Sequence, residues 1–409
     1  MTTHAEACTF QRVSDARSTQ FPLGAAITLE QLEAEPYDTL AALRTHEPVS
    51  WLPALSGWFV TTRELAVEVM RNANTYTVDD ERFTTAAVLG PSMLSVDGSE
   101  HNRHRLPFAP AFRPAVLREQ FEEFLSTEAR RLVMQLAPAG AAELRTTVAG
   151  PLAVSAIAEF LGLVDVSHDD ILAWYSGIAS AIVALTTGHT IADEDATAVL
   201  ELRRQIDNTL QHGANDSLLR QVQADGRLHA EEVTSAAAVL MFGAIETAEG
   251  MTANALAHLL SRPDVIAQVR SDRSAIAAVI EESLRLEPAA AFVDRYATTS
   301  APLGGVTIPA GELVTVSLLA ANRDPAVFDR PDDFVLNRSN VRQHVAFVQG
   351  PHACIGPHLA RLETNAAIEA VINCLDDITL DPASTTPASG LIFRKPHRVQ
   401  AQWSARSVR

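Results

Sequence analysis

One cysteine near the C-terminus has the surroundings of a reactive sulfur. Cys354 stands between two glycines in the loop 347–356, and an apolar pattern with helical spacing begins directly after it. Unpaired N–H groups and the helix dipole at that N-terminus favour a thiolate. His352 can direct a cation or a hydrogen-bond donor at an anionic group. Such a thiolate is a nucleophile or a metal ligand, and a buried free cysteine at a loop–helix junction is the alternative.

A second candidate site is a pair of basic residues. His101 and Arg105 are four residues apart, so on a helix they share one face and can clamp a pair of carboxylates. A zinc site on His101 and His104 is weaker, because no third ligand lies nearby and Arg103 would repel a dication. A basic, solvated helix face is the competing interpretation.

A carboxylate and a hydroxyl lie side by side in a long apolar helix, which opens near His229 and ends before Pro263. Gly243 and Thr247 share a face, so the hydroxyl can bond the Gly243 carbonyl or leave that turn open as a groove. Burying Glu246 costs several kcal/mol unless it is paired, hydrated or protonated. Exposure of Glu246 to solvent is the alternative.

The composition limits the possible partners. The chain has 409 residues, 47% hydrophobic content and a formal charge of −18, so nucleic acid and anionic membranes are unexpected partners. Three cysteines are too few for a disulfide framework and are typical of a reducing cytosol, so we expect a cytoplasmic protein. The N-terminus has no apolar signal region, and no apolar run is long enough to span a membrane.

The elements that position these residues are mainly helices. Residues 115–300 carry mostly helical periodicity, whereas 48–60 reads as a β-hairpin and 390–393 as a hydrophobic last strand. The apolar stretch 76–94 has no period and is typical of a long loop over a binding site. The sequence therefore predicts a mainly α fold with minor β (α+β).

No linker or change of composition divides the chain. We expect an irregular arm over residues 1–25 and a single domain over residues 26–409. That domain has a helix-rich core and β-rich N-terminal and C-terminal portions.

Together these motifs resemble the cytochrome P-450 family of the soluble bacterial type, over nearly the whole chain. The resemblance implies a long central helix over a haem b, with small β-sheets, and makes Cys354 the axial thiolate ligand of the iron. Glu282 and Arg285 match the family's Glu-x-x-Arg structural pair, and the segment 322–334 matches the stretch that pairs with it. The resemblance further implies that four residues hold the haem propionates, namely His101, Arg105, Arg295 and His352. One departure is Val348, where glycine is usual, and we expect tighter packing there.

The resemblance also implies an activity, a haem-thiolate monooxygenase that inserts one oxygen atom of O2 into a small hydrophobic substrate in secondary metabolism or catabolism. Glu246 and Thr247 would serve oxygen activation. Electrons would come from a ferredoxin and its reductase, docking on a basic patch formed by Arg103, His104, Arg113, His358 and Arg361. Coupling, demethylation or epoxidation by the same fold stays open, as does a peroxide-driven haem enzyme or a haem sensor. A cysteine hydrolase is poorly supported, because no His/Asp set lies beside Cys354.

The substrate pocket can be assigned only by family position, and residues 170–190 would form a moving lid over it. The residues assigned to the pocket are Phe83, Val88, Leu89, Leu240, Gly243, Ala291, Phe292, Val293 and Ile392.

Overall fold

A computed structural model describes residues 16–163, 165–186, 189–214 and 217–405. It forms two compact units, and each is assembled from separated stretches of chain. The sequence predicts one domain over residues 26–409. Because the chain passes between the two units several times, no single linker or change of composition marks their boundary in the sequence. Within the described residues, unit 1 comprises 16–77, 285–353 and 388–394, and unit 2 comprises 78–284, 354–387 and 395–405.

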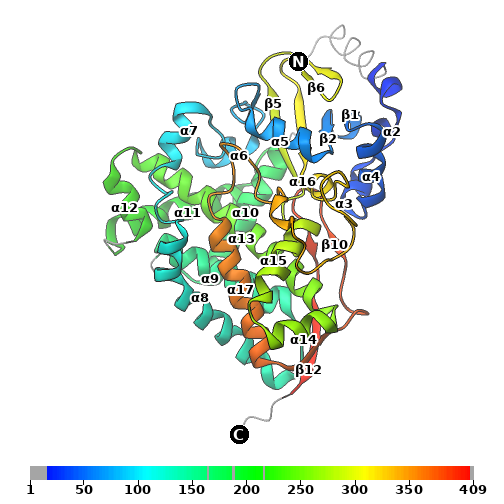
Figure 1. Ribbon diagram of the computed structural model, residues 1–409. Coiled ribbons are helices and arrows are strands. Elements are labelled where there is room, and N and C mark those ends of the chain that lie inside the picture. The colour runs from blue at the N-terminus through cyan, green and yellow to red at the C-terminus, as the bar shows by residue number, and fades with distance from the viewer. Residues whose placement is uncertain (1–15, 164, 187–188, 215–216, 406–409) are drawn as a thin grey trace. The chain divides into compact units, whose positions relative to one another are not determined.

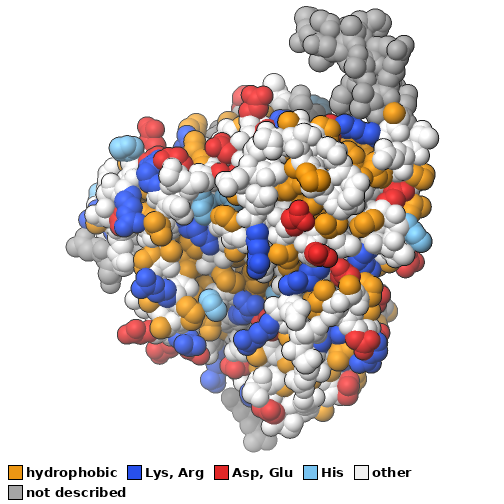
Figure 2. All heavy atoms as spheres, turned by 45° about the horizontal axis from the view of Figure 1, so that its top comes forward, with side chains coloured by type: hydrophobic (Ala, Val, Ile, Leu, Met, Phe, Trp, Pro, Cys, Tyr) orange, Lys and Arg blue, Asp and Glu red, His pale blue; other side chains and the backbone are white. Residues whose placement is uncertain are grey.

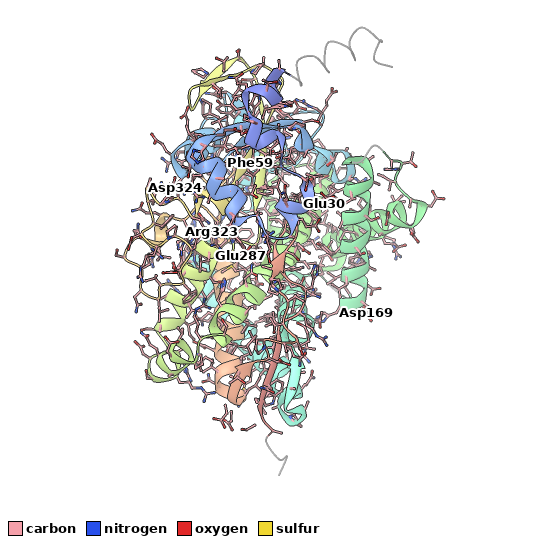
Figure 3. The ribbon with its side chains drawn as sticks, turned by 90° about the vertical axis from the view of Figure 1, so that its right-hand side faces the viewer. Glu30, Phe59, Asp169, Glu287, Arg323 and Asp324 are labelled. Atoms are coloured by element: carbon pink, nitrogen blue, oxygen red, sulfur yellow. The ribbon has the colours of Figure 1, made fainter. Side chains whose placement is uncertain are left out.

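Unit 1 is built on a five-stranded sheet with the order β1-β2-β8-β5-β3. β1 and β2 form the predicted hairpin, and β2 runs parallel to β8 while β5 runs antiparallel to it. Arg323 and Glu287 lie close together in this unit, 3.9 Å apart (Figure 3). The elements are α2 (Pro22–Ala25), α3 (Leu29–Glu33), α4 (Tyr37–His46), β1 (Val49–Leu52), η1 (Pro53–Leu55), β2 (Gly57–Val60), α5 (Arg63–Arg71), β3 (Tyr76–Thr77), β5 (Phe292–Ala297), β6 (Ala301–Leu303), β7 (Val306–Ile308), β8 (Leu313–Ser317), α16 (Leu318–Ala321), η4 (Val341–Gln343) and β10 (Ala388–Ser389).

The predicted N-terminal arm is partly wrong. Within residues 1–25 the structure describes 16–25, where α2 is helical and Phe21 is buried in the core of unit 1. Arg17 forms an ion pair with Glu312 at 2.6 Å. This stretch is therefore held by burial and by charge, while residues 1–15 lie outside the described part.

Unit 2 is mainly helical, and its helices pack around the long helix α13. Helix α17 runs beside α13 in Figure 1. It also holds a three-stranded sheet with the order β4-β12-β9. The mainly α fold with small sheets is thus confirmed. The elements are α6 (Thr84–Leu89), α7 (Gly98–Arg105), α8 (Pro114–Leu136), η2 (Ala137–Ala139), β4 (Ala141–Glu143), a π-helical turn η3 (Arg145–Ala149), α9 (Gly150–Leu161), α10 (His168–Thr186), α11 (Asp193–His212), α12 (Leu218–Asp225), α13 (Ala230–Leu260), α14 (Pro263–Ser271), α15 (Ala275–Leu286, whose last two residues belong to unit 1), α17 (Pro357–Cys374), β9 (Asp376–Leu380), β11 (Lys395–Pro396) and β12 (Gln400–Ser404).

Two sequence-based elements differ from the structure. The stretch 76–94, predicted as a loop, contains helix α6, which ends at Gly90 where φ is +89°. The predicted last strand over 390–393 is reduced to a bend and one isolated antiparallel bridge, between Phe393 and Ala290, and a Cβ on Gly390 would lie 2.0 Å from the Phe393 carbonyl oxygen. The last strand is β12.

None of the helices in the described part of the chain combines the length and the apolar character needed to cross a membrane. The stretch predicted as a lid, 170–190, lies mostly in α10, and its residues 187–188 are outside the described part.

Candidate functional site

Cys354 lies two residues before Gly356, the N-cap of α17, as the sequence predicts. The residue is solvent-accessible, yet enough protein surrounds the sulfur for desolvation to raise the pKa of its thiol. The Gly356 N–H and the cations of Arg105 and Arg361 act in the opposite direction. The free sulfur is therefore a neutral thiol at ordinary pH, and these three groups would support the thiolate once a metal replaced the proton.

The backbone before the cysteine takes two turns that few residues tolerate. Gly350 has φ of +78°, and a Cβ there would lie 2.3 Å from the carbonyl oxygen of Met70. Val348 has φ of +63°, a left-handed conformation that is a genuine outlier for a β-branched residue. Gly356, in contrast, has φ of −103°, a conformation open to other residues. The loop is strained at Val348 and sterically closed at Gly350.

Gly350→Ala is expected to destabilise unit 1 by more than about 2 kcal/mol, because it combines a left-handed φ with a backbone clash. Gly311→Ala is the matched control, since Gly311 has φ of +80° but open space around its Cβ position. We expect the control to lose only about 1 kcal/mol in urea denaturation. Equal losses for the two variants would show that the Met70 contact does not matter.

Helix α7 carries the predicted propionate-binding pair. His101 is buried, and Arg105 is partly buried, with a pKa lowered by desolvation and raised by its attraction to Cys354. The mutual electrostatic influence of Arg105 and Cys354 shows that the structure brings α7 and the start of α17 to one site within unit 2. A guanidinium there suits an anionic group near the sulfur.

The two other basic residues of α7 are committed elsewhere. Arg103 donates to Glu232 at 2.6 Å and to Glu100 at 2.8 Å, and lowers the pKa of Glu232 to about 2. His104 is buried, and desolvation lowers its pKa. His104 is too buried for the predicted docking patch, so that assignment is wrong, whereas Arg103 is partly exposed and its place in the patch stays a prediction. Through Glu232, Arg103 joins α7 to the first turn of α13.

Helix α13 has an open turn in its middle. Most of its residues are buried, but Gly243 is exposed, and a Cβ built there would meet nothing within 4 Å. The Thr247 hydroxyl donates to the Gly243 carbonyl at 2.5 Å. Both predicted alternatives hold together: the hydroxyl bonds back to the helix, and the turn faces unfilled space.

Glu246 is paired rather than free in solvent. Its two carboxylate oxygens accept from the Tyr175 hydroxyl and, at 2.8 Å, from the Lys395 ammonium. Lys395 also contacts Glu249 at 2.6 Å, and Glu249 accepts from Arg145 at 2.7 Å. No sequence motif pointed to Tyr175 or Lys395, because their partners lie far away along the chain.

Arg285 occupies the position expected of a structural anchor. It is fully buried and donates to the carbonyls of Asn322 at 3.1 Å, Pro331 at 2.6 Å and Asp333 at 2.9 Å. These three residues lie in the segment 322–334 that the sequence assigned to it. Glu282, one turn earlier in α15, is also buried.

The remaining predicted residues of unit 1 are distributed between its sheet and its core. Arg295 is buried on β5 and donates to the Asp294 carbonyl at 2.6 Å, while His352 is half-buried in the loop before the cysteine. Ala291 and Phe292 are buried in a hydrophobic cluster of unit 1, and their pocket role stays a prediction.

The other pocket assignments differ in exposure. Val293 is half-buried against the core of unit 1, whereas Ile392 is 52% exposed. In unit 2, Val88, Leu89 and Leu240 are buried and Phe83 is half-buried. The pocket role of these residues stays a prediction.

The donor set suits a haem better than a bare metal ion. Among the described residues, no three His, Cys, Asp or Glu side chains converge on a point that could hold a metal. A lone cysteine with a nearby guanidinium fits an iron whose other ligands belong to a planar, anionic macrocycle. The open turn at Gly243 leaves room for a small group at α13. Cys354 would bond the iron, and Arg105 and His101 would face the carboxylates of such a group.

Comparison with known proteins gives the family. A sequence profile described as Cytochrome P450 matches residues 188–377. The chain is 32% identical over 375 residues to cytochrome P450 monooxygenase PikC of Streptomyces venezuelae, covering 86% of each chain. It is 31% identical to nocardicin C N-oxygenase of Nocardia uniformis subsp. tsuyamanensis, covering 95% of this chain and 99% of that one. The structure of P450BioI, solved with a hexadec-9Z-enoic acid ligated acyl carrier protein, superposes with a TM-score of 0.82 at 26% identity, over 92% and 100% of the two chains.

The chain therefore belongs to the cytochrome P450 family. It has the fold of that family and is a haem monooxygenase, whose haem b is bound through a cysteine thiolate.

Proposed function

We propose that the protein hydroxylates a small hydrophobic substrate of bacterial secondary metabolism, with Cys354 as the haem ligand and Thr247 and Glu246 serving oxygen activation. The observation that carries this proposal is the turn between exposed Gly243 and half-buried Thr247, within a helix whose residues are mostly buried. A haem held by Cys354 would supply the oxidising chemistry. The protein excludes water around the substrate, orients it and holds the groups that move protons.

The names of the relatives support oxygenation without fixing the reaction. PikC is named a monooxygenase, and nocardicin C N-oxygenase is named for oxidation at nitrogen. Oxidative coupling, demethylation and epoxidation remain second candidates for the same site. Titration with a library of hydrophobic compounds, followed through the haem spin-state change and then by product analysis, separates these reactions. A spectral response with no oxygenated product would contradict the proposal.

Thr247→Ala is expected to lower the product formed per electron pair by about tenfold, because it removes the hydroxyl of the open turn. Thr247→Ser is the control, since it keeps the hydroxyl and loses one methyl group. The measurement compares product with NAD(P)H consumed. Full coupling in the alanine variant would contradict the role of Thr247.

A peroxide-driven enzyme or a haem sensor is the remaining alternative. Peroxide-driven relatives typically lack an acid–threonine pair, whereas this chain has Glu246 and Thr247 adjacent in α13. Product formed from peroxide alone, faster than from O2 and electrons, would favour that alternative.

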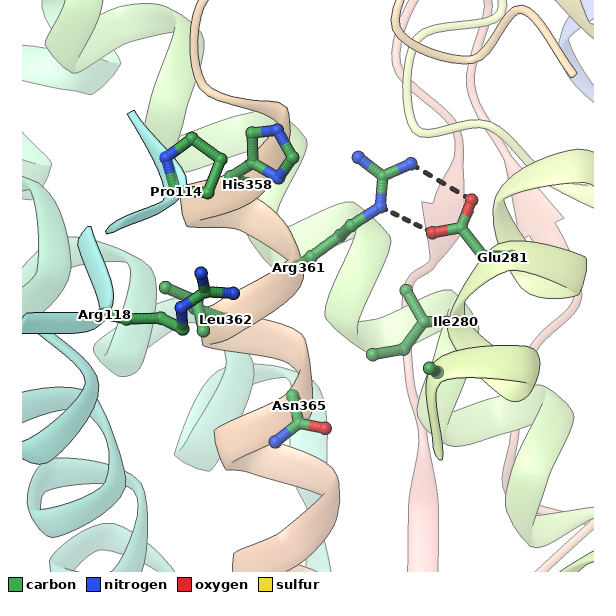
Figure 4. Close-up of a pocket in the computed structure, with 9 residues that line it drawn as sticks. Pro114, Arg118, Ile280, Glu281, His358, Arg361, Leu362 and Asn365 are labelled. Atoms are coloured by element: carbon green, nitrogen blue, oxygen red, sulfur yellow. Dashed lines mark hydrogen bonds and ion pairs between the residues drawn. The ribbon is translucent and has the colours of Figure 1, made fainter. Parts of the chain in front are cut away.

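We propose a ferredoxin and its reductase as the electron donors, in a cytoplasmic setting, with the ferredoxin docking at a basic hollow in unit 2. The hollow, of about 210 Å³, is lined by α8, α15 and the first turns of α17 (Figure 4). Arg118, His358 and Arg361 supply its basic groups, and Glu281 pairs with Arg361 at 2.5 Å. Arg361 also acts electrostatically on Cys354, so the hollow lies within reach of the sulfur.

The hollow offers local basic charge on a protein that is acidic overall. The protein has a net charge of −18, and on the face in Figure 2 basic side chains lie among acidic ones rather than in a separate field. Attraction must then be local. Burial and the neighbouring Arg361 and Arg118 lower the pKa of His358, so a carboxylate entering the hollow would favour its protonation.

Arg118→Glu is expected to slow electron transfer from a ferredoxin about tenfold at low ionic strength, with a smaller dependence on salt. Arg130→Glu is the matched control, because it makes the same charge change at an exposed site twelve residues further along α8. Stopped-flow reduction at several salt concentrations measures the effect. Equal behaviour of the two variants would remove the hollow as the docking site.

A further inference from the structure

A charge-balanced cluster joins four separate elements of unit 2 around Glu246 and Glu249. Tyr175 comes from α10, Glu246 and Glu249 from α13, and Lys395 from β11. Lys395 bridges the two carboxylates at 2.8 and 2.6 Å, and its side chain is 15% exposed. Arg145 in η3 completes the balance through Glu249 at 2.7 Å.

Tyr175 donates its hydroxyl proton to Glu246 from a fixed ring. Its ring stacks on Phe242 of α13, with centroids 5.7 Å apart and planes 24° from parallel. Desolvation and the bond to Glu246 raise the pKa of Tyr175, so its hydroxyl stays protonated. The hydroxyl proton therefore points at the Glu246 carboxylate whenever α10 is docked on α13.

The carboxylate of Glu246 is not aimed at its neighbour Thr247. Both of its oxygens carry a donor from this cluster, and the Thr247 hydroxyl donates to the Gly243 carbonyl. The cluster therefore sets where the Glu246 carboxylate rests. Of the two donors, Tyr175 is the one on α10, which meets α13 as a separate helix.

We propose that Lys395 and Tyr175 are positioning residues for Glu246, and that Tyr175 makes the placement of this carboxylate depend on the docking of α10 against α13. This inference rests on the proposed role of Glu246 in oxygen activation. Its consequence is that a docked α10 and a correctly placed proton-carrying group occur together, which limits electron use without product while α10 is undocked.

The first test does not need catalysis. Tyr175→Phe keeps the stacked ring and removes the hydroxyl, and Glu246→Gln removes the charge that accepts it. A double-mutant cycle compares the unfolding equilibrium constants of the two single variants and the double variant of the holoenzyme. We expect the constant of the double variant to rise at least about threefold less than the product of the two single increases. Hydrogen exchange of the α10 amides should rise in Tyr175→Phe. Additive effects with unchanged exchange would overturn the coupling.

The second test concerns the reaction. Tyr175→Phe should lower product per NAD(P)H at least about threefold and raise peroxide release, with the haem content and thiolate spectrum unchanged. Lys395→Arg should retain most of the coupling that Lys395→Met loses. Ser180→Ala is the matched control, because it removes another side-chain bond of α10, to Asp195 at 2.6 Å, without touching Glu246.

The outcomes separate this inference from the proposed function. Equal uncoupling by Ser180→Ala and Tyr175→Phe would mean that Tyr175 acts only through the stability of α10, and the inference would be wrong. A wild-type protein that forms no oxygenated product would instead refute the proposed function, while the double-mutant cycle would still report on the cluster.

Discussion

Replacing Cys354 with serine is expected to reduce monooxygenation by at least about 10³-fold, which corresponds to about 4 kcal/mol of transition-state stabilisation. A serine hydroxyl cannot donate electron density to iron as a thiolate does. The variant should also lose the red-shifted absorption that a thiolate ligand gives the reduced, carbon monoxide-bound haem. Activity and this spectrum should disappear together.

Cys374→Ser provides the comparison, at the far end of the helix that Cys354 precedes. Cys374 is buried at the far end of α17, so its replacement should cost some stability and leave the spectrum intact. A Cys354→Ser protein with a full thiolate spectrum would show that another cysteine binds the iron.

Arg394→Met is expected to destabilise unit 1 by about 3–5 kcal/mol, because it leaves a buried carboxylate without its main cation. Arg394 is fully buried, and its guanidinium donates to Glu287 at 2.8 Å. It also donates to backbone carbonyls on both sides, among them Glu33 at 2.6 Å and Ala388 at 2.8 Å. It thereby ties an N-terminal helix to the C-terminal turn. Urea denaturation measures the loss.

The double variant Arg394→Met/Glu287→Gln isolates the contribution of charge. Glu287 also accepts from Tyr37 at 2.5 Å, which raises the pKa of Tyr37 to about 12 together with burial, and a glutamine can keep that bond. We expect the double variant to be more stable than Arg394→Met alone. A double variant destabilised by the sum of the two single losses would show that packing, and not the unpaired charge, dominates.

Hydrophobic periodicity predicted the elements whose pattern is long enough to be recognised from neighbouring residues alone. The long helix was expected from about His229 to before Pro263 and runs over Ala230–Leu260, because thirty residues of helical spacing leave little ambiguity. Helix α6 was not predicted, because six residues rich in Thr and Ala are too few to show a helical period. The apolar run over 390–393 resembled a strand, but the close approach of Gly390 to Phe393 bends it.

For the candidate site, too, the sequence predicted local relations and missed long-range ones. Spacing along the chain placed Cys354 before a helix and Thr247 above Gly243, because each relation is local. The partners of the charged residues are not local: Lys395 meets Glu249 across 146 residues. Arg103 reads as a free cation in sequence, and only the fold shows that Glu232 neutralises it. Long-range ion pairs of this kind leave no pattern in one sequence.

The central claim is that a haem held by Cys354 transfers one atom of O2 to a hydrophobic substrate. The most direct measurement supplies isotopically heavy O2 to the protein, reconstituted with a ferredoxin, its reductase and a compound that shifts the haem spin state. The account predicts one heavy oxygen atom in the product and none in Cys354→Ser reactions. Product whose oxygen comes from water, or equal product from the serine variant, would contradict it.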